Sequence, residues 1–258
     1  MRDIGLDGSV VIVTGAAGGI GSAACAEFLE AGAAVVAVDI DANGVEQTVA
    51  SLAARGTIEA LVADLSNEAA VRSLIEEVQL RHFRIDVLFN NASIEGAVAP
   101  LIDYPTEIFD RVMAINVRSI FLTMKYVLPG MVERKSGAIV NMGSTASFRG
   151  PMALAGYTAS KHAVIGLTRT AAGEVARSGV RVNALCPGPT DTRMMESIEK
   201  LADPNAPTAV RESWINGIPR GQYGEPHELA RVAVILASPL MANVTGATWL
   251  ADGGLTAI

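Results

Sequence analysis

Short runs of aliphatic residues alternate with segments of helical periodicity along the whole of this 258-residue chain. Unbroken aliphatic runs are typical of strands buried on both faces, as in a parallel sheet that helices cover. Right-handed crossovers between such strands predict a doubly wound α/β sheet of about seven strands. The expected strands are 10–13, 35–38, 58–63, 87–89, 138–141, 180–185 and 247–251, and the expected helices are 19–31, 43–55, 68–81, 108–128, 157–177 and 226–237.

The domain organisation follows from this regular rhythm. No internal repeat or low-complexity linker interrupts it, so we expect a single domain over residues 1–258. The one break is segment 193–223, which contains three prolines and only weak patterning. A long insert of this kind near the end of a sheet is typical of a substrate lid, and an ordinary surface excursion is the alternative.

The charge balance excludes several classes of partner. The net charge is −7, and no basic run appears, so neither a nucleic acid nor an anionic membrane is expected to bind. The uncharged runs 8–26 and 232–251 are interrupted by glycine, proline or asparagine and do not predict membrane spans. No secretory signal is recognised, and we expect a cytoplasmic protein.

Cysteines and histidines give no sign of a metal or a disulfide. The two cysteines, Cys25 and Cys186, lack any paired spacing, which favours buried thiols in a reducing compartment. The three histidines are scattered, so no metal site is predicted.

A glycine-rich turn, Thr14-Gly-Ala-Ala-Gly-Gly-Ile-Gly21, stands between the first expected strand and its helix. Glycines there let backbone N–H groups approach a pyrophosphate, and the N-terminus of the helix favours the same anion. Glycine turns are common, but one that follows a strand and opens a helix is the context of a dinucleotide site. We therefore expect a Rossmann-type sheet with the cofactor-binding residues Gly15, Gly19, Ile20 and Gly21.

Asp39, at the end of the second expected strand, indicates which dinucleotide binds. A carboxylate there accepts hydrogen bonds from the adenosine ribose hydroxyls and repels a 2′-phosphate. Asp41 adds negative charge, and the turn holds Ala16 and Ala17 with no cation to bind a 2′-phosphate. The sequence therefore predicts NAD rather than NADP. The alternative for Asp39 is a helix N-cap or a solvated turn carboxylate.

Tyr157 and Lys161 stand four residues apart in an expected helix, which places them on one face about one turn apart. A positive charge beside a tyrosine stabilises the phenolate and lets the hydroxyl release its proton nearer neutral pH. Together with Ser144 upstream, the pair indicates proton transfer at a carbinol or carbonyl oxygen beside a bound dinucleotide. Each residue alone is more often structural, and only the combination indicates catalysis.

The order and spacing of these motifs resemble those of the classical short-chain dehydrogenases/reductases, over nearly the whole chain. The glycine turn is similar to the family's cofactor turn, and Asn116, Ser144, Tyr157 and Lys161 align with its catalytic tetrad. The other matching segments are Asp64-Leu65, Asn90-Asn91-Ala92, Pro187-Gly188 with Thr190 and Thr192, and Asp252-Gly253-Gly254.

The resemblance implies a role for each matching residue. Tyr157 would be the general acid/base, and Lys161 would lower its pKa and bind the nicotinamide ribose. Ser144 would hold the substrate oxygen, and Asn116 would hold a water that links Lys161 to solvent. The remaining cofactor-binding residues implied are Asp64, Leu65, Asn91, Ala92, Pro187, Gly188, Thr190 and Thr192, with Tyr157 and Lys161 also touching the cofactor.

The chain departs from the family pattern at two positions. Ser93 stands where glycine is usual, and Thr190 where isoleucine or valine is more typical. A side chain at Ser93 would lie close to the cofactor ribose or the substrate. Neither departure removes a catalytic group.

Segment 193–223 is rich in methionine and aliphatic side chains, which suits an apolar substrate, although packing onto the body is the alternative. No arginine pair is placed to hold an acidic substrate. We therefore expect a secondary, cyclic or apolar alcohol, or the matching ketone. The candidate substrate-binding residues are Ser93, Ala146, Met152, Met194 and Met195.

Three functions compete. The first is an NAD-dependent alcohol dehydrogenase or ketone reductase. The second is a 3-oxoacyl-thioester reductase of the same family, which use of NADPH would indicate. The third, a non-catalytic NAD-binding regulatory module, is expected to lack Ser144, Tyr157 or Lys161, and none is missing. The resemblance also implies a homo-oligomer, a tetramer more often than a dimer, paired through helices 108–128 and 157–177.

Overall fold

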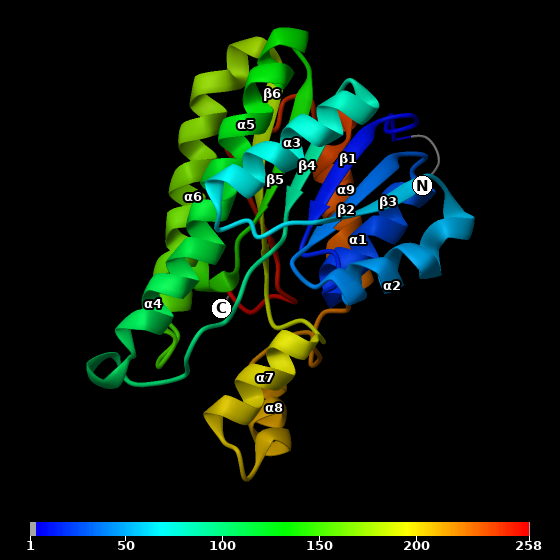
Figure 1. Cartoon of the computed structure of the whole chain (residues 1–258). Helices are drawn as coiled ribbons and strands as arrows, with labels where there is room; N and C mark the ends of the chain where they lie inside the picture. The colour runs from blue at the N-terminus through cyan, green and yellow to red at the C-terminus, as the bar shows by residue number, and fades with distance from the viewer. Residues whose placement is uncertain (1–3, 258) are drawn as a thin grey trace.

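The aliphatic runs pair as one seven-stranded sheet in the order β3-β2-β1-β4-β5-β6-β7, within the residues 4–257 that the computed structural model describes (Figure 1). Every pairing between neighbouring strands is parallel. Strand order reverses between β1 and β4, and ligands bind such sheets beyond the carboxyl ends at this point. The strands are β1 (Val10–Thr14), β2 (Ala34–Asp39), β3 (Ile58–Val62), β4 (Val87–Asn90), β5 (Gly137–Met142), β6 (Val180–Pro187) and β7 (Thr248–Ala251).

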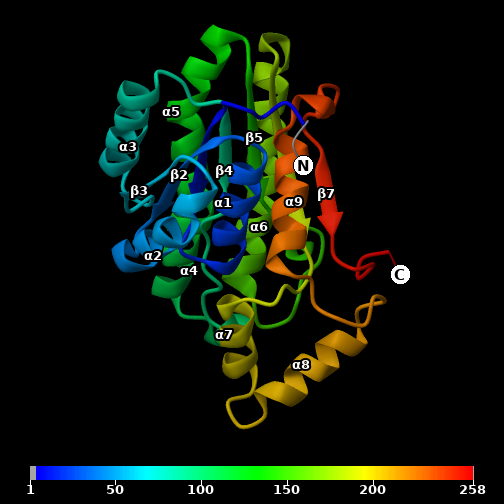
Figure 2. The same ribbon diagram turned by 90° about the vertical axis from the view of Figure 1, so that its right-hand side faces the viewer.

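Helices cover both faces of the sheet (Figures 1 and 2). Helices α1 and α9 pack on one face, and α3, α5 and α6 on the other. This arrangement confirms the predicted doubly wound α/β fold. The helices are α1 (Gly19–Glu30), α2 (Ala42–Leu52), α3 (Glu68–His82), α4 (Thr106–Met113), α5 (Ser119–Arg134), α6 (Ala155–Val175), α7 (Arg193–Ala202), α8 (Pro207–Asn216) and α9 (Pro226–Ala237).

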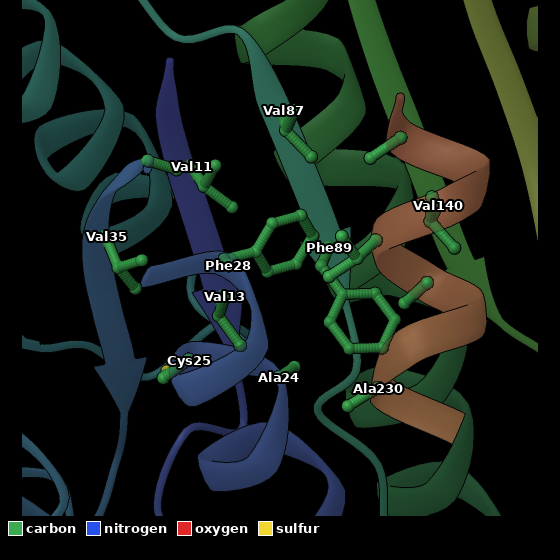
Figure 3. Close-up of a cluster of buried hydrophobic side chains, with 14 of the residues drawn as sticks. Val11, Val13, Ala24, Cys25, Phe28, Val35, Val87, Phe89, Val140 and Ala230 are labelled. Atoms are coloured by element: carbon green, nitrogen blue, oxygen red, sulfur yellow. The ribbon is translucent and has the colours of Figure 1, made fainter. Parts of the chain in front are cut away.

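The strands β1 and β4 are buried along their whole length, whereas the edge strands β3 and β7 are only partly buried. In β1, Val11 and Val13 face the cluster beneath α1 and α9, whereas Ile12 faces the cluster beneath α3 and α5. Figure 3 shows the first cluster, where Phe28 of α1 and Phe89 of β4 lie among the valines. With the central strands covered by helices on both faces, the carboxyl edge and its loops are where a ligand can approach them.

The helix expected over 108–128 is wrong in one respect, because it is not continuous. Helix α4 ends at Met113, a π-helical turn spans Ala114–Arg118, and α5 then continues through Pro129 to Arg134. The π turn carries Asn116, whose amide hydrogen-bonds both backbone groups of Ile94 in the loop after β4. Such turns are frequent at functional sites.

The insert at 193–223 is more regular than the expectation of a weakly patterned segment. It contains the two helices α7 and α8, which stand beyond the carboxyl edge of the sheet (Figure 1). Thr192 caps α7 by accepting a hydrogen bond from the backbone N–H of Met195 at 3.4 Å, and Pro207 opens α8. Helices placed here can cover a ligand at the switch point.

Arg181 is a buried cation that fastens α9 to β6, and its loss is expected to destabilise the fold. Its guanidinium donates to the carbonyls of Leu236, Ala237 and Ser238 at 2.7, 2.8 and 3.0 Å. Carbonyls at a helix C-terminus lack intrahelical partners and favour positive charge. Arg181→Met should lower the free energy of unfolding by about 3 kcal/mol in urea melts. The exposed Arg177→Met is the control, and equal effects of the two would contradict this role.

Candidate active site

A cavity of about 930 Å³ opens at the carboxyl edge of the sheet, where the loops after β1 to β6 meet α7 and α8. Most of the predicted site residues come together on its wall, although they are spread over 180 positions of sequence from Gly15 to Met195 (195 − 15). The predicted residues on the wall are Gly15, Gly19, Ile20, Asp39, Asp64, Leu65, Asn91, Ala92, Ser93, Ser144, Ala146, Tyr157, Pro187, Gly188, Thr190, Thr192, Met194 and Met195.

The glycine turn has the close packing that its residue type predicts. Gly15 has φ +68°, and a Cβ there would lie 2.8 Å from Cα of Ala92. A Cβ on Gly21 would overlap the carbonyl oxygen of Gly15, so Gly21 serves the packing of the turn and is not itself on the cavity wall. Helix α1 begins beside the cavity with Gly18 as its N-cap and no side-chain cap. An uncapped helix N-terminus behind glycines fits the pyrophosphate of a dinucleotide.

Asp39 is the last residue of β2 and lies on the cavity wall. Its carboxylate accepts hydrogen bonds from the backbone N–H groups of Ala17 at 2.9 Å and Asp41 at 3.0 Å. The N-cap of α2 is Asp41 instead, which accepts from the N–H of Gly44. Asp39 is therefore not a helix cap, and its held carboxylate fits the ribose hydroxyls of a dinucleotide.

The glycine turn itself holds no arginine or lysine, as the sequence shows, but a cation reaches it from another part of the fold. Arg193, the first residue of α7, lines the cavity and donates from Nη2 to the carbonyl of Ala17 at 3.0 Å. It lies 176 positions from that partner in the sequence, so only the fold brings the two together. A guanidinium here can bind a phosphate oxygen of a cofactor.

Ser144, Tyr157 and Lys161 converge where β5 and α6 meet. Ser144 follows β5 and caps a short 3₁₀ turn, with its Oγ accepting from the N–H of Ala146 at 3.1 Å. Tyr157 lies in the first turn of α6, two residues after that helix begins. Lys161 is 1% exposed; its Nζ donates to the carbonyl of Met142 at 2.9 Å and lies 5.4 Å from the Tyr157 ring centroid.

The pKa values in this group differ from the expectation. Burial raises the pKa of Tyr157 to about 12, against the lowering effect of the nearby Ser144 hydroxyl, and the charge of Glu95 raises it further. Burial disfavours the charged form of Lys161 too, and it therefore lowers the pKa of this ammonium to about 8. The predicted lowering of the Tyr157 pKa by Lys161 is therefore not found in the protein alone, because desolvation dominates and Lys161 itself tends to lose its charge. Perturbed pKa values in one cleft are typical of a functional site.

The side chain of Asn116 is engaged with protein groups on both its amide oxygen and its amide nitrogen. It is fully buried and off the cavity wall. Both amide hydrogens are used, by the Ile94 carbonyl at 2.9 Å and by Ser160 Oγ at 3.1 Å, while Oδ1 accepts from the N–H of Ile94. Ser160 in turn donates to the carbonyl of Tyr157 at 2.7 Å. The side chain thus holds the loop after β4 against the start of α6. Because its amide groups are all engaged, a water at Asn116 would have to bond to the main chain.

The structure places Met152 away from the cavity. Its side chain is 94% exposed and is not on the wall, so its assignment to the substrate site is wrong. Residues that sequence reasoning did not assign take its place, among them Arg111 of α4, Arg149 and Trp214 of α8. Arg149 follows Ser144 by only five positions, a proximity that could have identified it.

The described residues include neither a group of metal ligands nor a membrane-spanning helix. Within residues 4–257, no three histidine, cysteine or acidic side chains are grouped as metal ligands. No helix in the same range is both long enough and apolar enough to cross a bilayer.

Comparison with known proteins agrees with this geometry. A family profile described as "Enoyl-(Acyl carrier protein) reductase" matches residues 15–256. Levodione reductase of Leifsonia aquatica is 38% identical over 96% of this chain and 94% of that protein. The 2,5-dichloro-2,5-cyclohexadiene-1,4-diol dehydrogenase of Sphingobium indicum is 40% identical over 98% and 99%.

Solved structures superpose closely as well. An NAD⁺-bound xylitol dehydrogenase matches with a TM-score of 0.92 and 34% identity, over 96% of this chain and 99% of that one. A Beutenbergia cavernae protein, described as an NAD(P)-dependent gluconate 5-dehydrogenase and holding NADP, matches with a TM-score of 0.91 and 36% identity, over 99% of both chains. The neighbours therefore include binders of either nicotinamide cofactor.

Proposed function

Because the chain belongs to the classical short-chain dehydrogenase/reductase family and is an oxidoreductase like its relatives, we propose that it interconverts a secondary alcohol and its ketone with NAD(H). The observation that carries the proposal is that Tyr157 and Ser144 line the same cavity as the glycine turn and Asp39. A dinucleotide held by the turn would bring its nicotinamide to the tyrosine. The match to a cyclohexadiene-diol dehydrogenase supports a cyclic substrate.

The chain's own residues move one proton in this mechanism. Ser144 donates a hydrogen bond to the substrate oxygen and fixes its position, and Tyr157 takes the hydroxyl proton in oxidation or returns it in reduction. The Nζ of Lys161 lies 5.4 Å from the centre of the Tyr157 ring and supplies a positive charge there while it stays protonated. A nicotinamide cofactor held by the glycine turn and Asp39 would supply the hydride acceptor for oxidation and a second positive charge beside Tyr157.

The wall of the substrate end supports the choice of a largely apolar molecule. Met194, Met195 and Ile198 of α7 and Trp214 of α8 line the cavity together. Methionine adapts to irregular apolar shapes, and a shielded site strengthens the electrostatic interactions inside it. We propose that α7 and α8 act as the lid over the bound substrate.

Cofactor preference is expected to depend on Asp39. Wild-type protein should show kcat/KM at least about tenfold higher with NAD⁺ than with NADP⁺, since the carboxylate binds ribose hydroxyls and repels a 2′-phosphate. Asp39→Ala should reduce this ratio at least about tenfold. NADH absorbance measures both, with Asp103→Asn, an exposed residue off the cavity wall, as the control.

A preference for NADP⁺ in the wild type would contradict the proposal and would point to Arg193 as the 2′-phosphate partner. Arg193→Ala would then lower kcat/KM with NADP⁺ selectively. Turnover of acetoacetyl thioesters with NADPH in that case would favour the 3-oxoacyl-thioester reductase as the function.

The expected setting of the enzyme is a proposal too. We propose a cytoplasmic homo-oligomer, and a tetramer before a dimer, with a small molecule as its only ligand besides the cofactor. Both cysteines are free and buried, and α5 leaves Phe121 and Val132 partly exposed on its outer side. Sedimentation of the purified protein measures the oligomeric state.

A further inference from the structure

Glu95 is a carboxylate on the cavity wall for which the proposed proton transfer has no use. It lies in the loop after β4 and lines the same cavity as Tyr157 and Ser144. Among residues 4–257 its side chain takes part in no hydrogen bond or ion pair with protein atoms. An acceptor of this strength, partly buried and without a protein donor, is available to a ligand.

The backbone on both sides of Glu95 is held in place. On one side, the N–H and carbonyl of Ile94 bond to the amide of Asn116 at 2.8 and 2.9 Å. On the other side, the N–H of Ala97 donates to the Tyr104 hydroxyl at 3.2 Å. Gly96 between them has φ +77° and leaves no room for a Cβ, which would lie 2.6 Å from the Tyr104 oxygen. The loop therefore presents Glu95 from a fixed backbone, as a binding group requires.

The charge of Glu95 works against the general base. It raises the pKa of Tyr157 and so disfavours the phenolate that oxidation needs. A carboxylate that disfavours the Tyr157 phenolate does not help the proton transfer. Its position on a rigid loop in the same cavity is explained if it binds the substrate.

Besides Arg193, two further arginines lie on the wall of this cavity. Arg111 and Arg149 are exposed on its wall, and neither forms an ion pair within the described part of the chain. They offer an anionic substrate a partner at the rim. Glu95, unlike these arginines, is partly buried and lies on the same cavity wall as Tyr157 and Ser144.

We propose that Glu95 accepts a hydrogen bond from a second hydroxyl group of the substrate, so that the site selects neutral diols over simple alcohols. This inference rests on the proposed function and narrows its substrate class. An ionised carboxylate only accepts hydrogen bonds, so it discriminates for hydroxyl donors. The 3-oxo group and thioester of an acyl substrate carry no such donor, and Glu95 therefore also disfavours the alternative reductase.

The test compares matched alcohols in NAD⁺-linked oxidation. The panel is cyclohexanol, the isomers of 1,2- and 1,4-cyclohexanediol, and D-gluconate as an anionic polyol. For wild-type protein we expect kcat/KM for the best diol to exceed that for cyclohexanol at least about tenfold, as for a buried polar group that needs its partner. Glu95→Leu should reduce this ratio to within about twofold, and Glu95→Gln, which keeps an acceptor oxygen, should retain part of it.

A second readout separates binding from folding. Removing the negative charge should move the pH profile of cyclohexanol oxidation to lower pH in both Glu95 variants, because the pKa of Tyr157 falls. Glu107→Gln, an exposed carboxylate of α4 that is off the wall, should change neither the ratio nor the profile.

Each remaining outcome has a definite meaning. A diol preference that survives Glu95→Leu, or a wild type without one, would overturn the assignment of Glu95. Preference for gluconate would give the decisive role to Arg111 and Arg149 instead. If wild-type protein oxidises no alcohol, the proposed function fails. Thermal shifts of the NADH complex with diol and with cyclohexanol then still decide whether Glu95 binds a second hydroxyl.

Discussion

Tyr157→Phe is expected to lower kcat about 10³-fold while the affinity for NAD⁺ stays within about twofold. The substitution removes one hydroxyl and keeps the ring, so the packing at the start of α6 is preserved. General acid–base groups contribute about 10²- to 10⁴-fold, and Tyr157 is the group to which the proposed mechanism assigns this proton. Initial rates at the NADH absorbance band give kcat, and quenching of protein fluorescence gives the affinity.

The matched control is Tyr126→Phe. Its hydroxyl donates to Glu68 at 2.8 Å and lies off the cavity, so its loss should leave kcat unchanged. Equal losses of turnover and of NAD⁺ binding in Tyr157→Phe would contradict the assigned role. They would mean that the hydroxyl maintains the cofactor site and does not transfer the proton.

The parts of the fold and site that the sequence predicted correctly depend on local patterns. Val11, Ile12 and Val13 are consecutive and aliphatic because both faces of β1 are buried, and that pattern needs no tertiary information. The glycine turn is recognisable for a similarly local reason. Gly15 has a positive φ, and Gly21 has no Cβ because the carbonyl oxygen of Gly15 occupies that space. Such constraints act within a few residues and can be recognised from composition and spacing.

The parts that were not predicted depend on contacts between distant segments. Arg193 reaches Ala17 only because α7 stands over the carboxyl edge of β1. The π turn at Asn116 is stabilised by Ile94, in a loop 22 positions earlier. Nothing in either local sequence marks these pairings. Spacing likewise identifies the charged neighbour of Tyr157 but not how strongly burial acts on the pKa of the tyrosine.

Lys161 leads to a second large effect, in which function and stability are expected to change in opposite directions. Its ammonium is buried with one hydrogen bond, to the Met142 carbonyl, and no anionic partner among the described residues. Burial lowers its pKa from 10.5 to about 8, which corresponds to about 3 kcal/mol of preference for the neutral form. Below pH 8 the native state must hold the charge against that preference, so Lys161 destabilises the fold where the enzyme works.

Lys161→Met should therefore abolish most of the turnover yet raise the free energy of unfolding at pH 7 by about 2 kcal/mol, after the lost hydrogen bond is subtracted. Between about pH 8 and 10.5 the unfolded chain binds a proton at this position that the native chain does not, so wild-type stability rises with pH. The advantage of the variant should accordingly shrink between pH 7 and pH 10. Urea unfolding at both pH values measures it, with the exposed Lys200→Met as the control. A variant less stable than wild type at pH 7 would show that the Lys161 ammonium is stabilised by contacts that outweigh its burial.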